Sequence, residues 1–117
     1  MIERELDLTR TAALGDPATE EGRTALVEIF RVYFDQASAT VAAMRLSGSS
    51  DEVRARAHRA KGAGGVIGAP GLMASFDDLE ACAAAGEDVT ADTYDDLDRQ
   101  IAALRRTVSA RLAVDFQ

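Results

Sequence analysis

The sequence predicts an all-α protein, an antiparallel four-helix bundle with a short additional helix at its N-terminal end. Alanine supplies 23 of the 117 residues, whereas valine and isoleucine together supply only 12, a composition that favours helix over strand. Apolar residues recur every three or four positions, as on one face of a helix. Four long segments of this kind, joined by short connections, are typical of an antiparallel bundle.

The N-terminal part of the chain predicts one short and one long helix. Leucine and alanine residues indicate a short helix over residues 6–14, which Gly15 ends. Asp16 can cap the following helix, with Pro17 at its first position. We therefore place the long helix near residues 18–46, and expect the short one to cover one end of the bundle.

Capping signals mark the next two helices. Ser49 and Glu52 form a capping-box pattern, which predicts a third helix over about residues 50–67. Pro70 suits the first position of a fourth helix, and Gly86 is a suitable C-terminal stop for it.

The last helix is predicted over about residues 91–113. No internal repeat or low-complexity segment interrupts the pattern, and the length suits one domain, so we assign residues 1–117 to a single domain with a core of about residues 6–112. The apolar residues that repeat at helical spacing are predicted to form that core: Leu26, Ile29, Phe30, Tyr33, Ala37, Val41, Met44, Leu72, Phe76, Leu79, Ala83, Tyr94, Leu97, Ile101, Leu104, Val108 and Leu112.

Composition also excludes several classes of protein. One histidine and one cysteine cannot provide the usual ligands of a zinc site or form an internal disulfide. No apolar run is long enough to span a bilayer, and residues 1–5 lack the apolar core of a signal peptide. A formal charge of −7 disfavours nucleic-acid binding. We therefore expect a soluble, cytoplasmic monomer that binds neither nucleic acid nor membrane and holds no metal or cofactor.

The predicted third helix contains three glycines within four positions, Gly62, Gly64 and Gly65. An interior glycine costs about 0.8–1 kcal/mol relative to alanine, so some advantage should offset their presence. At about 100° per residue, Gly62 and Gly65 fall within about 40° of His58, whereas Gly64 falls nearer the core, where it could permit close helix approach. Two glycines therefore clear space beside the only imidazole of the chain.

Charged and apolar residues divide the same helix into two faces. Arg54 and Lys61 flank His58 and argue against its burial. Arg56 falls toward the core side in this projection, for no evident reason. The apolar side of the helix carries Val53, Ala60, Ala63 and Ile67.

This face suits phosphoryl transfer, because imidazole is a good nucleophile near neutral pH. Lys61, one turn from His58, can neutralise a phosphoryl group, and the glycines leave room for it. The sequence shows no carboxylate pair, second base or P-loop beside His58. We therefore expect a carrier whose partner supplies the remaining chemistry. The simpler interpretation is a surface histidine beside glycines that serve helix packing.

The segment His58-Arg59-Ala60-Lys61-Gly62, followed by Gly65, Gly68, Leu72 and Leu79-Glu80, resembles the histidine-containing phosphotransfer (HPt) domain pattern. It differs in having Ala60 where a larger aliphatic residue is common. The upstream segment from Leu6 to Phe30 also resembles the opening of the family, so the resemblance covers about residues 6–112.

The resemblance implies a four-helix bundle that accepts and donates phosphoryl groups without hydrolysing ATP. His58 would be the phosphoacceptor and Lys61 would stabilise the phosphoryl group. Gly62 and Gly65, with Arg54 and Arg59, would form the partner surface. The partner would be a response-regulator receiver domain or a hybrid histidine kinase, and the receiver would contribute Mg²⁺.

The charge distribution agrees with such a partner. Residues 53–75 contain four basic residues and no acid, whereas residues 76–98 contain nine acids and no base. The basic cluster around His58 could meet an acidic receiver surface. The acidic stretch is more simply explained as a solvated face that maintains solubility.

Three alternatives compete with the phosphorelay prediction. A sensor-kinase phosphoacceptor module usually has an acid directly after its histidine and a nearby proline, whereas Arg59 follows His58 and the next proline is Pro70. A helical adaptor could bind a receiver domain without phosphotransfer, although His58 and Lys61 are both present. A cofactor-binding bundle has little support, because no Glu-x-x-His motif occurs.

Overall fold

The computed structural model describes residues 6–116, which form helices joined by short connections and contain no strand. The prediction of an all-α protein is confirmed for this part of the chain. The residues on which the signal-peptide argument rested, 1–5, lie outside it. The described helices are α2 (Leu8–Leu14), α3 (Glu20–Leu46), α4 (Ser50–Ile67), α5 (Pro70–Ala84) and α6 (Ala91–Leu112).

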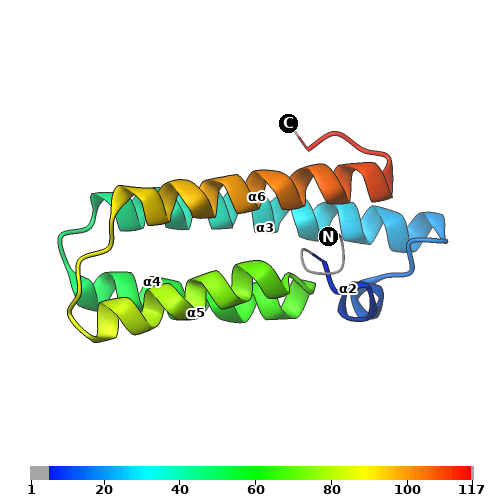
Figure 1. Ribbon diagram of the computed structural model, residues 1–117. Coiled ribbons are helices and arrows are strands. Elements are labelled where there is room, and N and C mark those ends of the chain that lie inside the picture. Colours follow the sequence, from blue (N-terminus) through cyan, green and yellow to red (C-terminus); the bar gives the residue numbers. More distant parts are fainter. Residues whose placement is uncertain (1–5, 117) are drawn as a thin grey trace.

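The four long helices lie in two layers (Figure 1). Helices α3 and α6 form one layer and α4 and α5 the other, and the chain reverses direction at each connection. The most extensive contact joins α4 to α5. The molecule is elongated, 46 × 24 × 23 Å, and α2 lies at the end where α4 passes into α5 (Figure 1).

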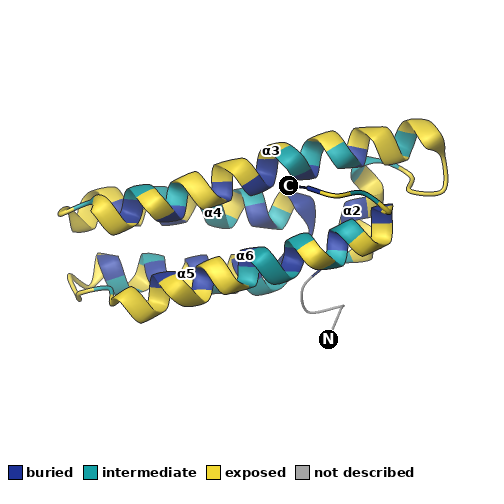
Figure 2. Cartoon of the chain, turned by 90° about the horizontal axis from the view of Figure 1, so that it is seen from above, coloured by how far each residue is buried: buried dark blue, intermediate teal, exposed yellow. Residues whose placement is uncertain are grey.

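The four long helices and the segments beside them contribute to one core, and Figure 2 marks its buried positions along the ribbons. The predicted core residues are buried, except Ile29, which is partly buried against the core. The core also includes Ala57, Ala69 and Phe116, which the helical pattern did not single out. Leu6, expected in the short first helix, is buried as well but precedes α2, which begins at Leu8. Phe116 reaches the core because the last residues fold back onto Phe34, with the ring centroids 5.3 Å apart.

Most helix ends agree with the capping signals in the sequence. The Ser49 side chain accepts a hydrogen bond from Glu52 N–H. The Glu52 carboxylate accepts from the hydroxyl of Ser47, so only half of the predicted capping box forms. Pro70 occupies the first turn of α5. Gly86 follows the C-cap of that helix with a φ of 72°, as a C-terminal stop requires.

The prediction that Asp16 caps α3 is wrong. The N-cap is Thr19, whose side chain accepts from Gly22 N–H, and the Asp16 carboxylate instead accepts from Ala18 N–H within a turn. The backbone of this turn folds directly against the first turn of α3. A β-carbon at Gly22 would overlap the Asp16 carbonyl, so the glycine makes the turn feasible.

Helix α4 ends at Gly68, whose φ of 83° is readily adopted only by glycine. Its N–H and that of Ala69 donate to the carbonyls of Gly65 and Gly64, which closes the last turn of the helix. Ala69 directly precedes α5, so this tight connection places α5 antiparallel beside α4. No described helix is both long and apolar enough to cross a membrane.

Candidate functional site

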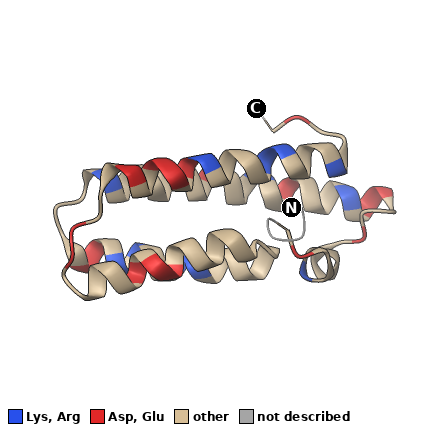
Figure 3. Cartoon of the chain, in the orientation of Figure 1, with Lys and Arg blue, Asp and Glu red and all other residues tan. Residues whose placement is uncertain are grey.

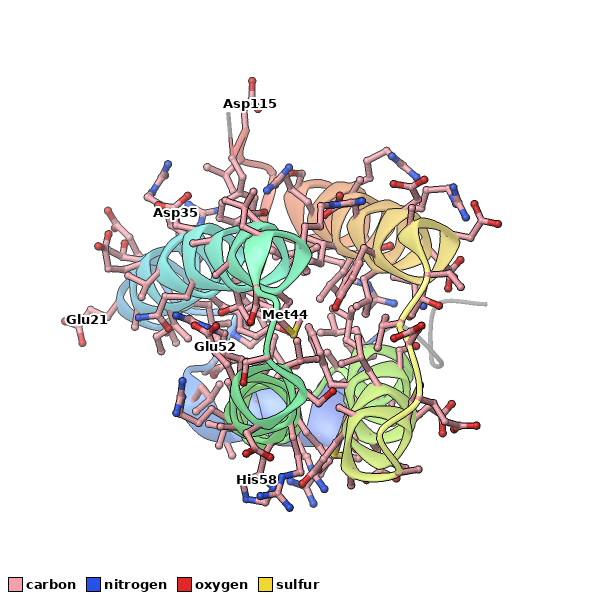
Figure 4. All side chains as sticks on the ribbon, turned by 90° about the vertical axis from the view of Figure 1, so that its left-hand side faces the viewer. Glu21, Asp35, Met44, Glu52, His58 and Asp115 are labelled. Atoms are coloured by element: carbon pink, nitrogen blue, oxygen red, sulfur yellow. The ribbon has the colours of Figure 1, made fainter. Side chains whose placement is uncertain are left out.

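His58 lies in the middle of α4 and faces solvent, since its side chain is 66% exposed. Seen along the bundle in Figure 4, it points outward from α4, whereas Met44 points into the interior. The alanines that precede and follow His58 in α4 favour helix. Ala57, the residue directly before His58, is fully buried. The helix thus holds the imidazole at the surface on a packed support.

The apolar side of α4 packs as the projection predicts. Val53, Gly64 and Ile67 are buried, and Ala60 and Ala63 are partly buried against the core. Arg56, which the projection places toward the core side, is partly buried and lines a groove with Tyr33 and Ala37 of α3. Arg56 Nε lies 3.2 Å from Glu52 Oε1, one turn earlier on the same helix, and this ion pair holds the guanidinium at the surface.

Two carboxylates from α5 complete the surroundings of His58. Glu80 Oε2 lies 2.9 Å from His58 Nδ1, and Glu80 Oε1 lies 2.8 Å from Lys61 Nζ. Asp77 Oδ1 lies 3.0 Å from the same ammonium nitrogen. The expectation that no carboxylate pair accompanies His58 is therefore wrong.

The missing carboxylates follow from the register of α4 against α5. Residues 58 and 80 are separated by 22 positions and residues 61 and 77 by 16, and both pairs are centred on Ala69 in the α4–α5 connection. Once α5 is known to fold back directly after α4, counting outward from Ala69 finds both pairs. Periodicity within a single helix carries no such information, which is why the sequence alone favours a solvated face for these acids.

The ion pairs shift the pKa values of both partners. The Lys61 ammonium, and then the His58 ring, hold the pKa of Glu80 below its usual value, although partial desolvation opposes them. The carboxylates of Glu80 and then Asp77 raise the pKa of Lys61. Both groups are therefore charged at neutral pH.

An ionised Glu80 determines which nitrogen of His58 carries the proton. A carboxylate can only accept a hydrogen bond, so Nδ1 must donate to it. In the neutral imidazole the lone pair then lies on Nε2. The site therefore offers a nucleophilic nitrogen with a fixed tautomer, next to a lysine ammonium.

The glycines of α4 differ in the space around them. A β-carbon at Gly62 would have no neighbour within 4 Å, whereas one at Gly65 would lie 3.2 Å from Met73 Sδ. One at Gly64 would make ordinary contacts with Ala69 and Met73. Only Gly62 therefore leaves open space beside His58.

Arg54 and Arg59 are exposed, and neither forms an ion pair with another described residue. The other two cations of the cluster, Arg56 and Lys61, are paired with acids. Figure 3 shows both signs of charge side by side on the α4–α5 layer. The site is consequently less basic than the sequence indicated, and Arg54 and Arg59 are the cations of this cluster without an acidic partner among residues 6–116.

Acids of the 76–98 stretch also form ion pairs away from His58. Arg45 of α3 lies 2.7 Å from Asp95 and 2.8 Å from Asp98 of α6. Within the described range, no group of three or more His, Cys, Asp or Glu side chains could hold a metal ion.

A family model described as the Hpt domain matches residues 28–107, which include the whole of α4 and α5 and more than half of the chain. The comparisons with curated proteins and with solved structures gave no match.

Proposed function

Since this chain belongs to the Hpt domain family, we propose that it is a phosphorelay intermediate. It accepts a phosphoryl group on His58 from a receiver-domain aspartate or a histidine kinase pathway and passes it to a response regulator. The single observation that best supports this is the hydrogen bond between His58 Nδ1 and Glu80, because it leaves Nε2 free on an exposed side chain. We also infer that α3 to α6 form the antiparallel four-helix bundle predicted from the sequence, with α2 as the additional helix.

The transfer step uses the Nε2 lone pair of the neutral imidazole. Nε2 attacks the phosphorus of the aspartyl phosphate, an N–P bond forms, and the P–O bond to the aspartate breaks. The bonding electrons leave with the aspartate carboxylate. The imidazole ring, still protonated at Nδ1, becomes cationic, and the Glu80 carboxylate stabilises that charge.

The remaining roles follow from the surroundings of His58. Lys61 neutralises charge on the phosphoryl oxygens, and the open space at Gly62 admits the phosphoryl group and the partner. The surface that includes Gly65, Arg54 and Arg59 contacts an acidic receiver. The receiver contributes the Mg²⁺ needed for transfer, and the chain acts as a cytoplasmic monomer without ATP binding of its own.

Phosphorylation by a receiver tests the proposal directly. Incubation with a phosphorylated receiver domain should place acid-labile, base-stable phosphate on the wild-type chain. His58→Gln should abolish the labelling and leave the circular dichroism spectrum unchanged. Cys82→Ser, which removes the only thiol of the chain, should be labelled like wild type.

Two outcomes would contradict the proposal. Labelling that survives His58→Gln would show that the phosphoacceptor is another residue. A wild-type chain that binds the receiver but takes up no phosphate would instead be the adaptor considered from the sequence.

A further inference from the structure

The ammonium group of Lys61 lies between two carboxylates, Asp77 and Glu80. We propose that Asp77 is a positioning residue that competes with the phosphoryl group for Lys61 and thereby shortens the lifetime of phosphohistidine. This inference rests on the proposed function, since it concerns the same site. It assigns a role to a residue that the resemblance did not include.

The two carboxylates differ in what else they bind. Glu80 contacts both His58 and Lys61, and its side chain is only 22% exposed. Asp77 is 62% exposed, and Lys61 is its only side-chain partner within the described range. Asp77 therefore acts on the site through Lys61 alone, whereas Glu80 also fixes the ring of His58.

The spacing of the residues explains why Asp77 reaches Lys61. His58 and Lys61 are three positions apart on α4, and Asp77 and Glu80 are three positions apart on α5, which runs antiparallel to α4 (Figure 1). Side chains at i and i+3 lie on the same face of a helix. His58 therefore faces Glu80, and Lys61 faces Asp77. The Glu80 carboxylate also contacts Lys61, so it links the two pairs.

Phosphorylation of His58 places a second kind of anionic partner within reach of the Lys61 ammonium group. The phosphoryl group brings negative charge and several acceptor oxygens to His58. Lys61 can approach it only by weakening its contacts with α5. Glu80 remains bound to the ring, so the contact with Asp77, on the more exposed carboxylate, is the one to be given up. A carboxylate at position 77 thus holds the ammonium back from the phosphoryl group.

The size of the effect follows from the exposure of the pair. Exposed ion pairs are weak and are screened by solvent. Removing the Asp77 charge should therefore lengthen the lifetime of phosphohistidine by about two- to fivefold. Glu80, whose loss would also disturb the imidazole, is the less informative position to change.

The decisive variant is Asp77→Asn, with Asp78→Asn as the matched control. Asp78 is the next residue on α5 and is exposed, so the control makes the same change in net charge without touching Lys61. Each protein would be phosphorylated with phosphoramidate, freed of the donor, and followed by ³¹P NMR. We expect slower loss of phosphohistidine in Asp77→Asn only, and no effect of Asp77→Asn when Lys61→Ala is also present.

A second measurement needs no phosphorylation. Lys61 is the only lysine of the chain, so its side-chain ¹³Cε resonance can be titrated without overlap. Asp77→Asn should lower the pKa of Lys61, because one of the two carboxylates that raise it is gone. Asp78→Asn should leave that pKa unchanged.

The outcomes separate the two proposals. Absence of phosphohistidine in the wild-type chain would overturn the proposed function. Normal phosphohistidine with equal lifetimes in wild type, Asp77→Asn and Asp78→Asn would overturn only the role of Asp77. An effect of Asp77→Asn that persists in the Lys61→Ala background would also overturn it, because the aspartate would then act by another route. If Asp77→Asn lowers the unfolding temperature without changing the lifetime of phosphohistidine, the Lys61–Asp77 ion pair is only a structural contact between α4 and α5, and the proposed role of Asp77 is wrong.

Discussion

Glu80 contacts both His58 and Lys61 through its two carboxylate oxygens: one is hydrogen-bonded to His58 Nδ1 and the other forms an ion pair with Lys61. Its position after Leu79 formed part of the resemblance, but no sequence argument assigned it a contact. His58 and Lys61 could be chosen from the sequence because they share one helix face. Glu80 and Asp77 could not, because their role depends on how a second helix is aligned.

The first residue-scale prediction concerns the neutral variant Glu80→Gln. The amide cannot stabilise the cationic imidazole formed by transfer, so phosphorylation of His58 by phosphoramidate should slow by about tenfold. The initial rate, measured by ³¹P NMR at neutral pH, tests this. Glu87→Gln is a suitable control, because Glu87 is exposed in the α5–α6 connection. Equal rates in the two variants would show that Glu80 does not assist the transfer.

The same variant carries a pH prediction. The folded state lowers the pKa of Glu80 from its ordinary value of 4.5, so the carboxylate stabilises the fold above that pH. The stabilisation is lost as the pH falls from 4.5 through the lowered pKa. The difference in unfolding temperature between wild type and Glu80→Gln should therefore be present at pH 7 and shrink below pH 4.5. A difference that grows on acidification would contradict the lowered pKa.

At the scale of elements, helix boundaries were predictable wherever the capping residue acts within its own turn. Ser49 and Pro70 begin α4 and α5 as expected. The start of α3 was not predictable from Asp16 and Pro17, because the close approach of this turn to Gly22 decides it. Local patterns located the helices, but contacts between segments determined this boundary.

The glycines of α4 give the element-scale prediction. A β-carbon at Gly62 would meet nothing within 4 Å, so Gly62→Ala should raise the free energy of unfolding by about 0.8–1 kcal/mol. Gly62→Met should be labelled more slowly by phosphoramidate and lose transfer from a receiver domain, because the longer side chain occupies the space that admits the phosphoryl group and the partner. Urea denaturation and transfer assays check the two halves. Normal receiver transfer in Gly62→Met would show that the open space is not needed.

At the scale of the whole molecule, the sequence predicted an all-α chain with a short first helix covering one end, and α2 lies at the end of the α4–α5 pair (Figure 1). The means of attachment was not predictable. Asp7 N–H donates to the Gly68 carbonyl, and Arg10 Nη1 donates to the Gly65 carbonyl at 3.0 Å. These bonds join segments that are far apart in the chain, so periodicity within a helix does not indicate them. The family match does not cover α2 either, because it begins at residue 28.

The buried hydroxyl of Thr11 gives the whole-molecule prediction. It donates to the carbonyl of Ile67 at the end of α4, at 3.0 Å, and the side chain is 7% exposed. Thr11→Val keeps the shape but leaves this buried carbonyl without that donor, which should lower the free energy of unfolding by about 1–3 kcal/mol. Thr9→Val, at an exposed position of α2, is the control.

Chemical denaturation measures the loss, and hydrogen exchange shows where it acts. If α2 stabilises the connection between α4 and α5, exchange at the amides of Gly68 and Ala69 should accelerate in Thr11→Val and not in Thr9→Val. Labelling of His58 by phosphoramidate should persist in both variants, since α2 does not contact the imidazole. Equal stability of Thr11→Val and Thr9→Val would mean that the packing of α4 against α5 does not depend on the Thr11 hydrogen bond from α2.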